Sequence, residues 1–254
     1  MAKLLEGKAT IVTGAAQGIG FAIAKEMALH GCGVLGCDLN AEKLDSAFKT
    51  IADLSGGKAI GMRADVGSKN DVEAVVKRGI EEFGGIDILV NNAGILIHAP
   101  VLEMREEDWD RIFQVNVKGF FLFAQAVGRR MVQQGRGKII NISSCSAKKP
   151  TLHEGAYSAT KAAILGLNRV LAWELGPHGV TVNAILPGAT DTEMVRSAFL
   201  TTPEIEQEWI EKTALKRLGT PRDQAKVAVF LASELADHIT GEAIVVSAGE
   251  MMSQ

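Results

Sequence analysis

The glycine-rich stretch over residues 14–20 constrains this chain most. It reads Gly-Ala-Ala-Gln-Gly-Ile-Gly, after the short apolar, β-leaning run Ala9–Thr13 and before a helical pattern over residues 21–30. A strand, a glycine turn and a helix in this order are typical of a dinucleotide site, because glycines let a pyrophosphate approach the backbone. The free N–H groups of the helix N-terminus then favour the phosphates. A flexible surface loop is the alternative. The cofactor candidates here are Gly14, Gln17, Gly18, Ile19 and Gly20.

Strand and helix patterns alternate along the rest of the chain, which is typical of an α/β fold. No linker or repeat interrupts the alternation, so residues 1–254 are expected to form one domain for dinucleotide binding and catalysis. The pattern loosens over residues 189–220, which we expect to form a substrate lid. Further strands are expected at 34–37, 59–63, 86–90, 138–142, 180–186 and 243–246, and further helices at 41–54, 70–83, 106–131, 157–176 and 221–235.

An acidic residue, Asp38, follows the second expected strand, about 20 residues beyond the glycines. A carboxylate there binds the adenine ribose hydroxyls and repels a 2'-phosphate. The glycine stretch carries no Arg or Lys, so both features favour NAD over NADP, with Leu39 as a neighbouring contact. Capping of the following helix is the alternative for Asp38. Asp65 and Val66 follow the third strand, where the Asp binds the adenine edge or is a turn residue.

Two groups of asparagines stand out between the fourth and fifth strands. Asn91-Asn92-Ala93-Gly94 ends the fourth strand, and its small residues suggest close backbone approach to a ligand at the carboxyl edge of the sheet. Asn116 lies inside the expected helix 106–131, and a buried Asn must be hydrogen-bonded. It either holds a water or a backbone carbonyl near the site or has a purely structural role.

Tyr157, the only tyrosine, lies four residues before Lys161, a spacing that puts both side chains on one face of a helix. A phenol has a pKa of about 10 and is a poor acid or base at neutral pH. A neighbouring ammonium favours the phenolate and lowers that pKa. Ser144, at the end of the fifth strand, can hold a substrate oxygen beside the phenol. This spacing is weak evidence by itself.

Charge and composition exclude several classes of protein. The chain has 27 basic and 30 acidic residues and no run of like charges that would indicate a nucleic-acid arm. Its N-terminus is too charged for a signal peptide, and no apolar run reaches the length of a membrane span. Its three cysteines have no metal-ligand spacing. We therefore expect a cytoplasmic protein without metal, nucleic-acid or membrane partners.

Taken together and in order, these motifs resemble the short-chain dehydrogenase/reductase family over nearly the whole chain. The family's glycine motif is similar to residues 13–20, its Asn-Asn-Ala-Gly to residues 91–94, and its Ser, Tyr and Lys to Ser144, Tyr157 and Lys161, with a gap of 13 between Ser and Tyr. Its residues at the nicotinamide end correspond to Pro187, Gly188, Thr190 and Thr192. One departure is Val246-Ser-Ala-Gly249, where the family often has Val-Asp-Gly-Gly.

The resemblance implies a single-domain, Rossmann-type, doubly wound parallel sheet of about seven strands with helices on both faces. It also implies hydride transfer between a nicotinamide and a carbonyl or secondary alcohol. Tyr157 would exchange the proton on the substrate oxygen, and Lys161 would lower its pKa and hold the nicotinamide ribose. Ser144 would bind the oxygen, and Asn116 would anchor a water for proton relay.

The leading hypothesis is an NAD-dependent oxidoreductase for a secondary alcohol, of a polyol, sugar-type or other small hydroxy compound. The alternative within the family is a 3-oxoacyl-thioester reductase. Such enzymes usually prefer NADPH and have a basic residue in the glycine loop, whereas this chain has Ala15, Ala16 and Gln17. A dinucleotide-binding regulator without catalysis is an alternative of another class, but such proteins typically lack the Tyr or the Lys.

Glu154, three residues before Tyr157, is the main candidate for substrate contact. A carboxylate accepts hydrogen bonds from hydroxyl groups and repels anions, so a neutral polyhydroxylated substrate is expected. Ser146 and His153 are further substrate candidates, while His98 or Lys148 would offset the negative charge. A solvated loop position is the alternative for Glu154 and His153.

The helix 157–176 is apolar around much of its circumference, including Ile164, Leu165, Val170 and Trp173. One face can cover the sheet, and the other would be an exposed apolar stripe in a monomer. A homo-oligomer is therefore expected, and the family resemblance suggests a homotetramer.

Overall fold

The structure, a computed structural model, describes residues 3–149 and 151–252. Its strands form one seven-stranded sheet in the order β3-β2-β1-β4-β5-β6-β7, and every neighbouring pair is parallel. The order reverses between β1 and β4, so the expected doubly wound α/β fold is confirmed. The strands are β1 Ala9–Thr13, β2 Gly33–Asp38, β3 Ala59–Arg63, β4 Ile88–Asn91, β5 Gly137–Ile142, β6 Val180–Pro187 and β7 Ala243–Val246.

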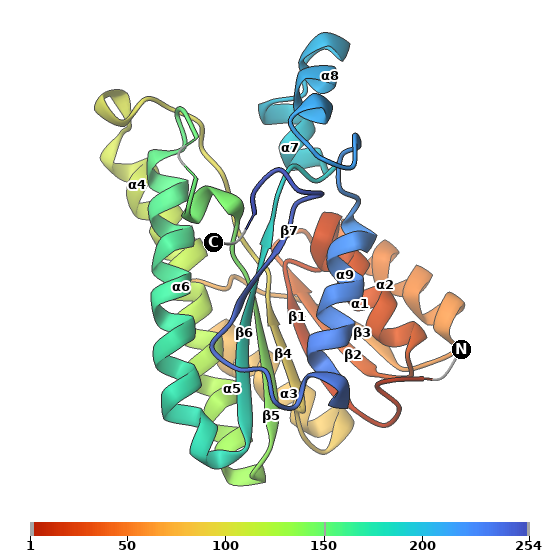
Figure 1. The fold of residues 1–254 in the computed structure, drawn as a ribbon. Helices are drawn as coiled ribbons and strands as arrows, with labels where there is room; N and C mark the ends of the chain where they lie inside the picture. Colours follow the sequence, from red (N-terminus) through yellow and green to blue (C-terminus); the bar gives the residue numbers. More distant parts are fainter. Residues whose placement is uncertain (1–2, 150, 253–254) are drawn as a thin grey trace.

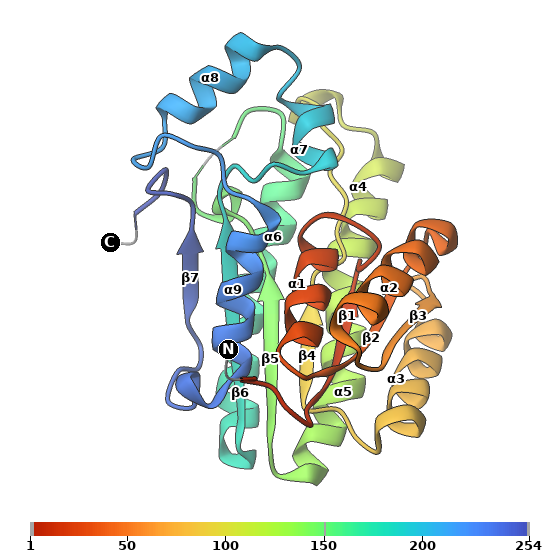
Figure 2. The ribbon, with the colours of Figure 1, turned by 90° about the vertical axis from the view of Figure 1, so that its right-hand side faces the viewer.

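Helices cover both faces of the sheet (Figures 1 and 2). Helices α1, α2 and α9 pack on one face, and α3, α5 and α6 pack on the other. No helix in the described ranges is long and apolar enough to cross a membrane. The helices are α1 Gly18–Leu29, α2 Ala41–Ser55, α3 Lys69–Phe83, α4 Glu106–Phe113, α5 Phe120–Gln134, α6 Gly155–Leu175, α7 Glu193–Ala198, α8 Pro203–Glu211 and α9 Pro221–Ala232.

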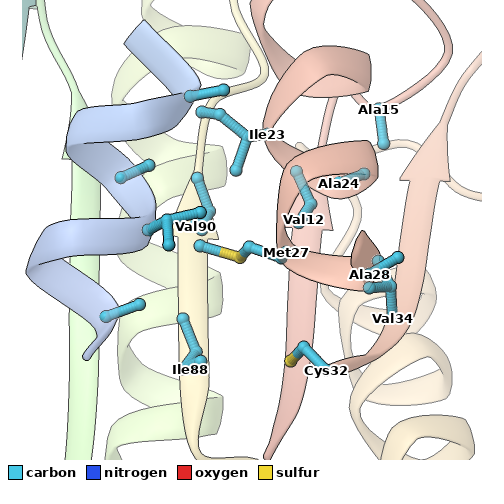
Figure 3. Packing of buried hydrophobic residues seen from close by; sticks show 14 of the residues in the cluster. Val12, Ala15, Ile23, Ala24, Met27, Ala28, Cys32, Val34, Ile88 and Val90 are labelled. Atoms are coloured by element: carbon cyan, nitrogen blue, oxygen red, sulfur yellow. The ribbon is translucent and has the colours of Figure 1, made fainter. Parts of the chain in front are cut away.

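The core beneath α1 and α9 supports the glycine loop (Figure 3). Ile23 and Met27 of α1 point toward Val12 and Val90 on the adjacent strands β1 and β4. All four side chains are fully buried. Burial of such a side chain contributes roughly 1.5–3 kcal/mol, so this packing holds the N-terminal end of α1 rigidly beside the end of β1.

Several helix boundaries differ from the sequence prediction, and two of these differences lie next to the site. Helix α1 begins at Gly18 rather than residue 21, so the last glycines of the loop belong to its first turn. The expected helix over 106–131 is instead α4 and α5 joined by a π-helical turn, Gln114–Gly119. Such turns are rare and concentrate at functional sites. Here the turn contains Asn116. The Asn116 side chain accepts a hydrogen bond from Ile95 N and donates one to Ile95 O, and these two bonds anchor the wider turn.

Helices α7 and α8 project beyond the carboxyl edge of the sheet (Figures 1 and 2). They lie within the segment 189–220, where the sequence pattern loosens. Thr192 and Thr202 cap their N-termini by accepting hydrogen bonds from backbone N–H groups. The two ends of the segment lie side by side and are joined by backbone hydrogen bonds. Gly219 N donates to Ala189 O at 2.9 Å, and Gly219 O accepts from Asp191 N at 2.8 Å.

Candidate active site

A cavity of about 390 Å³ lies at the carboxyl ends of the central strands. In open α/β sheets ligands bind at this edge, at the point where the strand order reverses. Two ends of the cavity can be distinguished by their residues. The nucleotide end carries the glycine loop and Asp38, and the substrate end carries Ser144, Tyr157 and Glu154.

At the nucleotide end, the N-terminus of α1 faces the cavity without a cap. No side chain caps its first turn and no acidic residue lies there. Gly14 and Gly18 have φ angles of 63° and 58°, in the left-handed region that favours glycine. A Cβ atom at Gly20 would collide with the carbonyl oxygen of Gly14. The loop therefore requires glycine and leaves backbone N–H groups available to a phosphate.

The Asn-Asn-Ala-Gly turn is fastened to the end of β1. Thr13 Oγ1 accepts hydrogen bonds from the backbone N–H groups of Asn92 and Ala93, each at 3.0 Å. In return, Asn92 Nδ2 donates to the carbonyl oxygens of Thr13 at 2.9 Å and Gly14 at 3.0 Å. Asn92, Ala93 and Gly94 all line the cavity, so this turn both closes it and fixes the glycine loop.

Asp38 lines the cavity beside the glycine loop. Its carboxylate accepts from the N–H of Ala16 at 3.2 Å and from that of Asn40 at 3.0 Å. Lys43 of α2 also reaches this end, which its position in the sequence did not indicate. Its Nζ donates to Gln17 Oε1 at 2.8 Å and to Glu193 Oε2 of α7 at 3.0 Å. Lys43 thus connects α2 with the glycine loop and with α7, which belongs to the segment 189–220.

Four cofactor candidates do not line the cavity: Gly20, Leu39, Asp65 and Val66. Gly20 is buried in the first turn of α1. Leu39 is 55% exposed. Asp65 is exposed, and its carboxylate accepts from Gly67 N at 2.8 Å, as a turn residue does. Val66 is buried, and its side chain would meet a Cβ placed on Gly119. The sequence left open whether Asp65 binds the adenine edge or is a turn residue, and its geometry in the structure is that of a turn residue.

Pro187, at the end of β6, and Gly188, Thr190 and Thr192 of the following loop also line the cavity. Thr190 is buried and donates through Oγ1 to the carbonyl oxygen of Gly188 at 3.0 Å. The amide of Gln224 donates to the same Thr190 Oγ1 at 3.2 Å. These contacts tie the loop to the start of α9.

Tyr157 and Lys161 lie on α6, and Ser144 follows β5. Lys161 Nζ lies 5.4 Å from the centre of the Tyr157 ring and donates to the carbonyl oxygen of Ile142 at 2.9 Å. The Ser143 hydroxyl donates to the carbonyl oxygen of Lys161, also at 2.9 Å. Strand β5 and helix α6 are therefore joined in both directions where the three predicted catalytic side chains meet.

The electrostatics of this group differ from the sequence expectation in one respect. Burial raises the pKa of Tyr157 well above its ordinary value, and Glu154 raises it further, whereas the Ser144 hydroxyl lowers it. Burial also lowers the pKa of Lys161 to about 8. The predicted lowering of the phenol's pKa by Lys161 is not found in the protein alone. The physical reason is that the ammonium is itself desolvated and is directed at Ile142.

Asn116 lies in the π-helical turn and is 1% exposed. Its Oδ1 accepts from Ile95 N at 2.8 Å, and its Nδ2 donates to Ile95 O at 3.0 Å and to Thr160 Oγ1 at 3.1 Å. Its side chain is thus occupied in joining the loop after β4 to α6. A Cβ on Gly94 would lie 3.4 Å from Asn116 Oδ1 and 3.5 Å from Lys161 Nζ, so Asn116 sits directly behind the catalytic group.

Ser146 and Glu154 line the substrate end, whereas His153 does not. His153 is exposed and stacks edge-on against His98, with ring centres 5.1 Å apart. Glu154 is only 4% exposed, which removes the solvated-loop alternative for it. Its pKa is raised above the ordinary value, mainly by burial and also by Glu250, while Ser146 and His98 lower it.

Four further residues at this end were not anticipated: Lys149, Phe199, Trp209 and Glu250. Phe199 and Trp209, from the segment 189–220, have ring centres 5.6 Å apart. Phe199 also stacks edge-on against His98 at 5.3 Å. The lid predicted over residues 189–220 includes Phe199 and Trp209, but the sequence singled out neither of them. Glu250 was not a site candidate, because tertiary folding alone brings it to β5 and α6.

The described residues fit a nicotinamide dinucleotide. The uncapped α1 N-terminus and glycine loop suit the pyrophosphate, and Asp38 suits a ribose. Pro187, Gly188, Thr190 and Thr192 line the same cavity as Tyr157. Within the described ranges, no three His, Cys, Asp or Glu side chains gather in a way that could hold a metal ion.

Known proteins similar to this chain cover nearly its whole length. A family model described as enoyl-(acyl carrier protein) reductase matches residues 14–250. The 3-oxoacyl-[acyl-carrier-protein] reductase FabG of Chlamydia muridarum is 38% identical over 250 residues, covering 98% of this chain and 99% of the relative. The 7alpha-hydroxysteroid dehydrogenase of Escherichia coli K12 is 38% identical over 245 residues, covering 96% and 94%.

Solved structures show the same fold. A 7alpha-hydroxysteroid dehydrogenase in complex with NADH and 7-oxoglycochenodeoxycholic acid aligns with a TM-score of 0.93 and 37% identity, covering 97% of this chain and 95% of that one. The chain belongs to the short-chain dehydrogenase/reductase family. It is an NAD(P)-dependent oxidoreductase acting on a CH–OH group or the corresponding carbonyl, and this sets aside a non-catalytic regulator.

Proposed function

We propose that this enzyme transfers a hydride between NAD(H) and a neutral, hydroxyl-rich secondary alcohol or its ketone, such as a polyol or sugar-type compound. When bound, the dinucleotide supplies or accepts the hydride. Tyr157 exchanges the proton on the substrate oxygen, and Ser144 donates a hydrogen bond to that oxygen. Lys161 holds the nicotinamide ribose, and Asn116 keeps α6 and the loop after β4 in register through its bonds to Ile95 and Thr160.

The cofactor-binding residues in this proposal are those of the glycine loop, Asp38, the Asn92–Gly94 turn and the loop from Pro187 to Thr192. The proposed preference is NAD over NADP. The Asp38 carboxylate supports it, because a 2'-phosphate beside it would be repelled. Among the described residues that line this end of the cavity, Lys43 is the cation that acts against this preference, but it is already bonded to Gln17 and Glu193.

The observation that carries the substrate class is the environment of Glu154. Its Oε2 is buried, and among the described residues no group donates a hydrogen bond to it. An unpartnered buried polar atom costs about 1–3 kcal/mol, so its persistence at a cavity favours a partner supplied by the ligand. A substrate hydroxyl supplies that donor whether Glu154 is ionised or protonated.

The Glu154→Gln variant tests this proposal. It keeps the shape of the side chain but replaces a carboxyl oxygen by an amide that is a donor. We expect it to lower kcat/KM for a neutral polyol and to improve the relative use of the corresponding acid. The measurement is kcat/KM for both substrates on both proteins, after a screen of NAD reduction with polyols, aldonates, hydroxyacids and hydroxysteroids. An unchanged ratio would remove Glu154 from the substrate site.

A second candidate, a 3-oxoacyl-thioester reductase, is favoured by the names of several relatives, including FabG of Chlamydia muridarum at 38% identity. The uncharged glycine loop speaks against it. The same assay distinguishes the two: such a reductase would reduce a 3-oxoacyl thioester with NADPH at least as efficiently as it oxidises any polyol with NAD.

The proposal extends to assembly and organisation. The outer face of α6 exposes Val170 and Trp173, which are 53% and 85% exposed, and α5 exposes Phe121 at 46%. Apolar surface of this kind supports a homotetramer built through these helices. We further propose that residues 1–254 form one domain, that residues 189–220 act as the substrate lid, and that the enzyme is cytoplasmic.

A further inference from the structure

The C-terminal turn brings a second carboxylate into the substrate end of the cavity. This turn follows β7 and contains the Ser247-Ala248 departure from the family pattern. Ala248 and Gly249 have φ angles of 54° and 81°, and Glu250 N donates to Ser247 O at 3.0 Å. The turn reverses the chain so that Glu250, with a side chain 9% exposed, lies in the cavity wall.

The turn packs tightly against the loop after β6. A Cβ placed on Gly188 would lie 2.6 Å from Ser247 Cβ and 2.8 Å from Glu250 Oε2. Glu250 Oε2 also accepts from the backbone N–H of Ala189 at 3.0 Å. The position of this carboxylate is therefore fixed by backbone geometry and by a direct bond to the wall beside Gly188.

The other oxygen of Glu250 pairs with the cation of the substrate loop. Lys149 Nζ lies 3.2 Å from Glu250 Oε1, and the Lys149 side chain is 44% exposed. Two ammonium groups line this part of the cavity, those of Lys149 and Lys161. Lys161 is 3% exposed and donates to Ile142 O, whereas Lys149 is partly exposed and is the cation that an incoming anion can meet. Glu250 pairs with Lys149 and offsets its charge.

We propose that Glu250 determines substrate charge by neutralising Lys149, so that the cavity accepts uncharged alcohols and rejects carboxylates. This inference rests on the function proposed above and names the residue that enforces it. A solved structure described as a putative gluconate dehydrogenase, from Agrobacterium tumefaciens, shares this fold at 31% identity and a TM-score of 0.93. The related 7alpha-hydroxysteroid dehydrogenase structure holds 7-oxoglycochenodeoxycholic acid, so the fold can accommodate an acid, and local charges then decide the choice.

The test uses a matched pair of six-carbon ligands, glucitol and gluconate, and the variants Glu250→Gln and Lys149→Met. Gln keeps an oxygen that accepts from Ala189 N, so only the charge is lost. We expect Glu250→Gln to raise the gluconate-to-glucitol ratio of binding constants roughly three- to tenfold, as for a partly exposed ion pair. Lys149→Met should lower that ratio, and the double variant should lose the gain.

Binding is measured by calorimetry on the enzyme with NADH, and kcat/KM is measured in parallel. Lys148→Met is the control, because Lys148 is exposed and does not line the cavity. Three results would each overturn the inference. The first is a gluconate-to-glucitol ratio that is the same in Glu250→Gln as in the wild type, and the second is a raised ratio that persists in the double variant with Lys149→Met. The third is an absence of gluconate binding to both the wild type and Glu250→Gln. If no polyol is oxidised while the binding ratio shifts as stated, the proposed function fails and the role of Glu250 stands.

Discussion

Lys161 Nζ donates to the carbonyl oxygen of Ile142 at 2.9 Å, and this bond joins the catalytic helix to the strand that carries Ser144. Because both groups are buried, the bond holds the ammonium at the end of β5, beside the Tyr157 ring. The protein alone therefore sets the position of the lysine, while burial keeps the phenol protonated.

Replacement of Tyr157 by Phe should lower kcat by at least about 10²-fold, the usual scale for loss of a general acid or base. The hydroxyl is the proton donor and acceptor in the proposal, and the ring that packs beside Lys161 remains. Cofactor affinity, measured by fluorescence titration with NADH, should change little. Near-normal turnover in this variant would show that Tyr157 does not carry the proton.

Replacement of Asp38 by Ala together with Leu39→Arg should narrow or reverse the preference for NAD. The change removes the carboxylate that faces the cavity and adds a cation at a position that is 55% exposed. The measurement is kcat/KM with NAD and NADP for both proteins. The single change Leu39→Gln serves as the control. Equal efficiency of the wild type with the two cofactors would contradict the assignment of Asp38.

The contribution of Lys161 to the free energy of unfolding should increase with pH. Its pKa is about 8 in the fold against an ordinary value of 10.5, so the unfolded chain binds more protons between these values. The free energy of unfolding contributed by this site therefore rises across that window. Between pH 7.5 and 9.5, the wild type should gain on the order of 2 kcal/mol relative to Lys161→Met.

Urea unfolding at both pH values, without cofactor, measures this difference. Lys77→Met is the matched control, since that side chain is 77% exposed on α3 and its loss should leave the pH dependence unchanged. Tyr157 acts in the opposite direction only above its ordinary pKa near 10, which is why the comparison stops at pH 9.5. Parallel curves for the wild type and Lys161→Met would disprove the depressed pKa.

Introducing charge on the outer face of α6, with Val170→Glu and Trp173→Glu together, should dissociate the proposed tetramer. Burying two carboxylates in an apolar interface without partners is strongly unfavourable. Light scattering at micromolar concentration gives the mass of each protein. Leu54→Glu on α2 is the control, because Leu54 is 54% exposed on the opposite face of the sheet. A monomeric wild type would refute the tetramer outright.

The sequence alone predicted the α/β class, the strands and the glycine loop, and it singled out Ser144, Tyr157 and Lys161, which the fold brings into one cavity. These features rest on local patterns: alternating apolar segments, glycines at fixed spacing, and a helical separation of four residues. The same local patterns misplaced the start of α1 and missed the π-helical turn at Asn116, since side-chain bonds to Ile95 across the fold stabilise that turn.

Only the tertiary structure decided which charges meet at the substrate end. Glu154 and Lys149 precede α6, but Glu250 comes from the end of the chain, and its contact with Lys149 spans 101 positions. It likewise separated Glu154, which is buried, from its neighbour His153, which is exposed. Charge interactions depend on the distance between the charges in space and on their burial. Neither quantity can be read from the number of residues between two side chains, because the chain changes direction many times along that length.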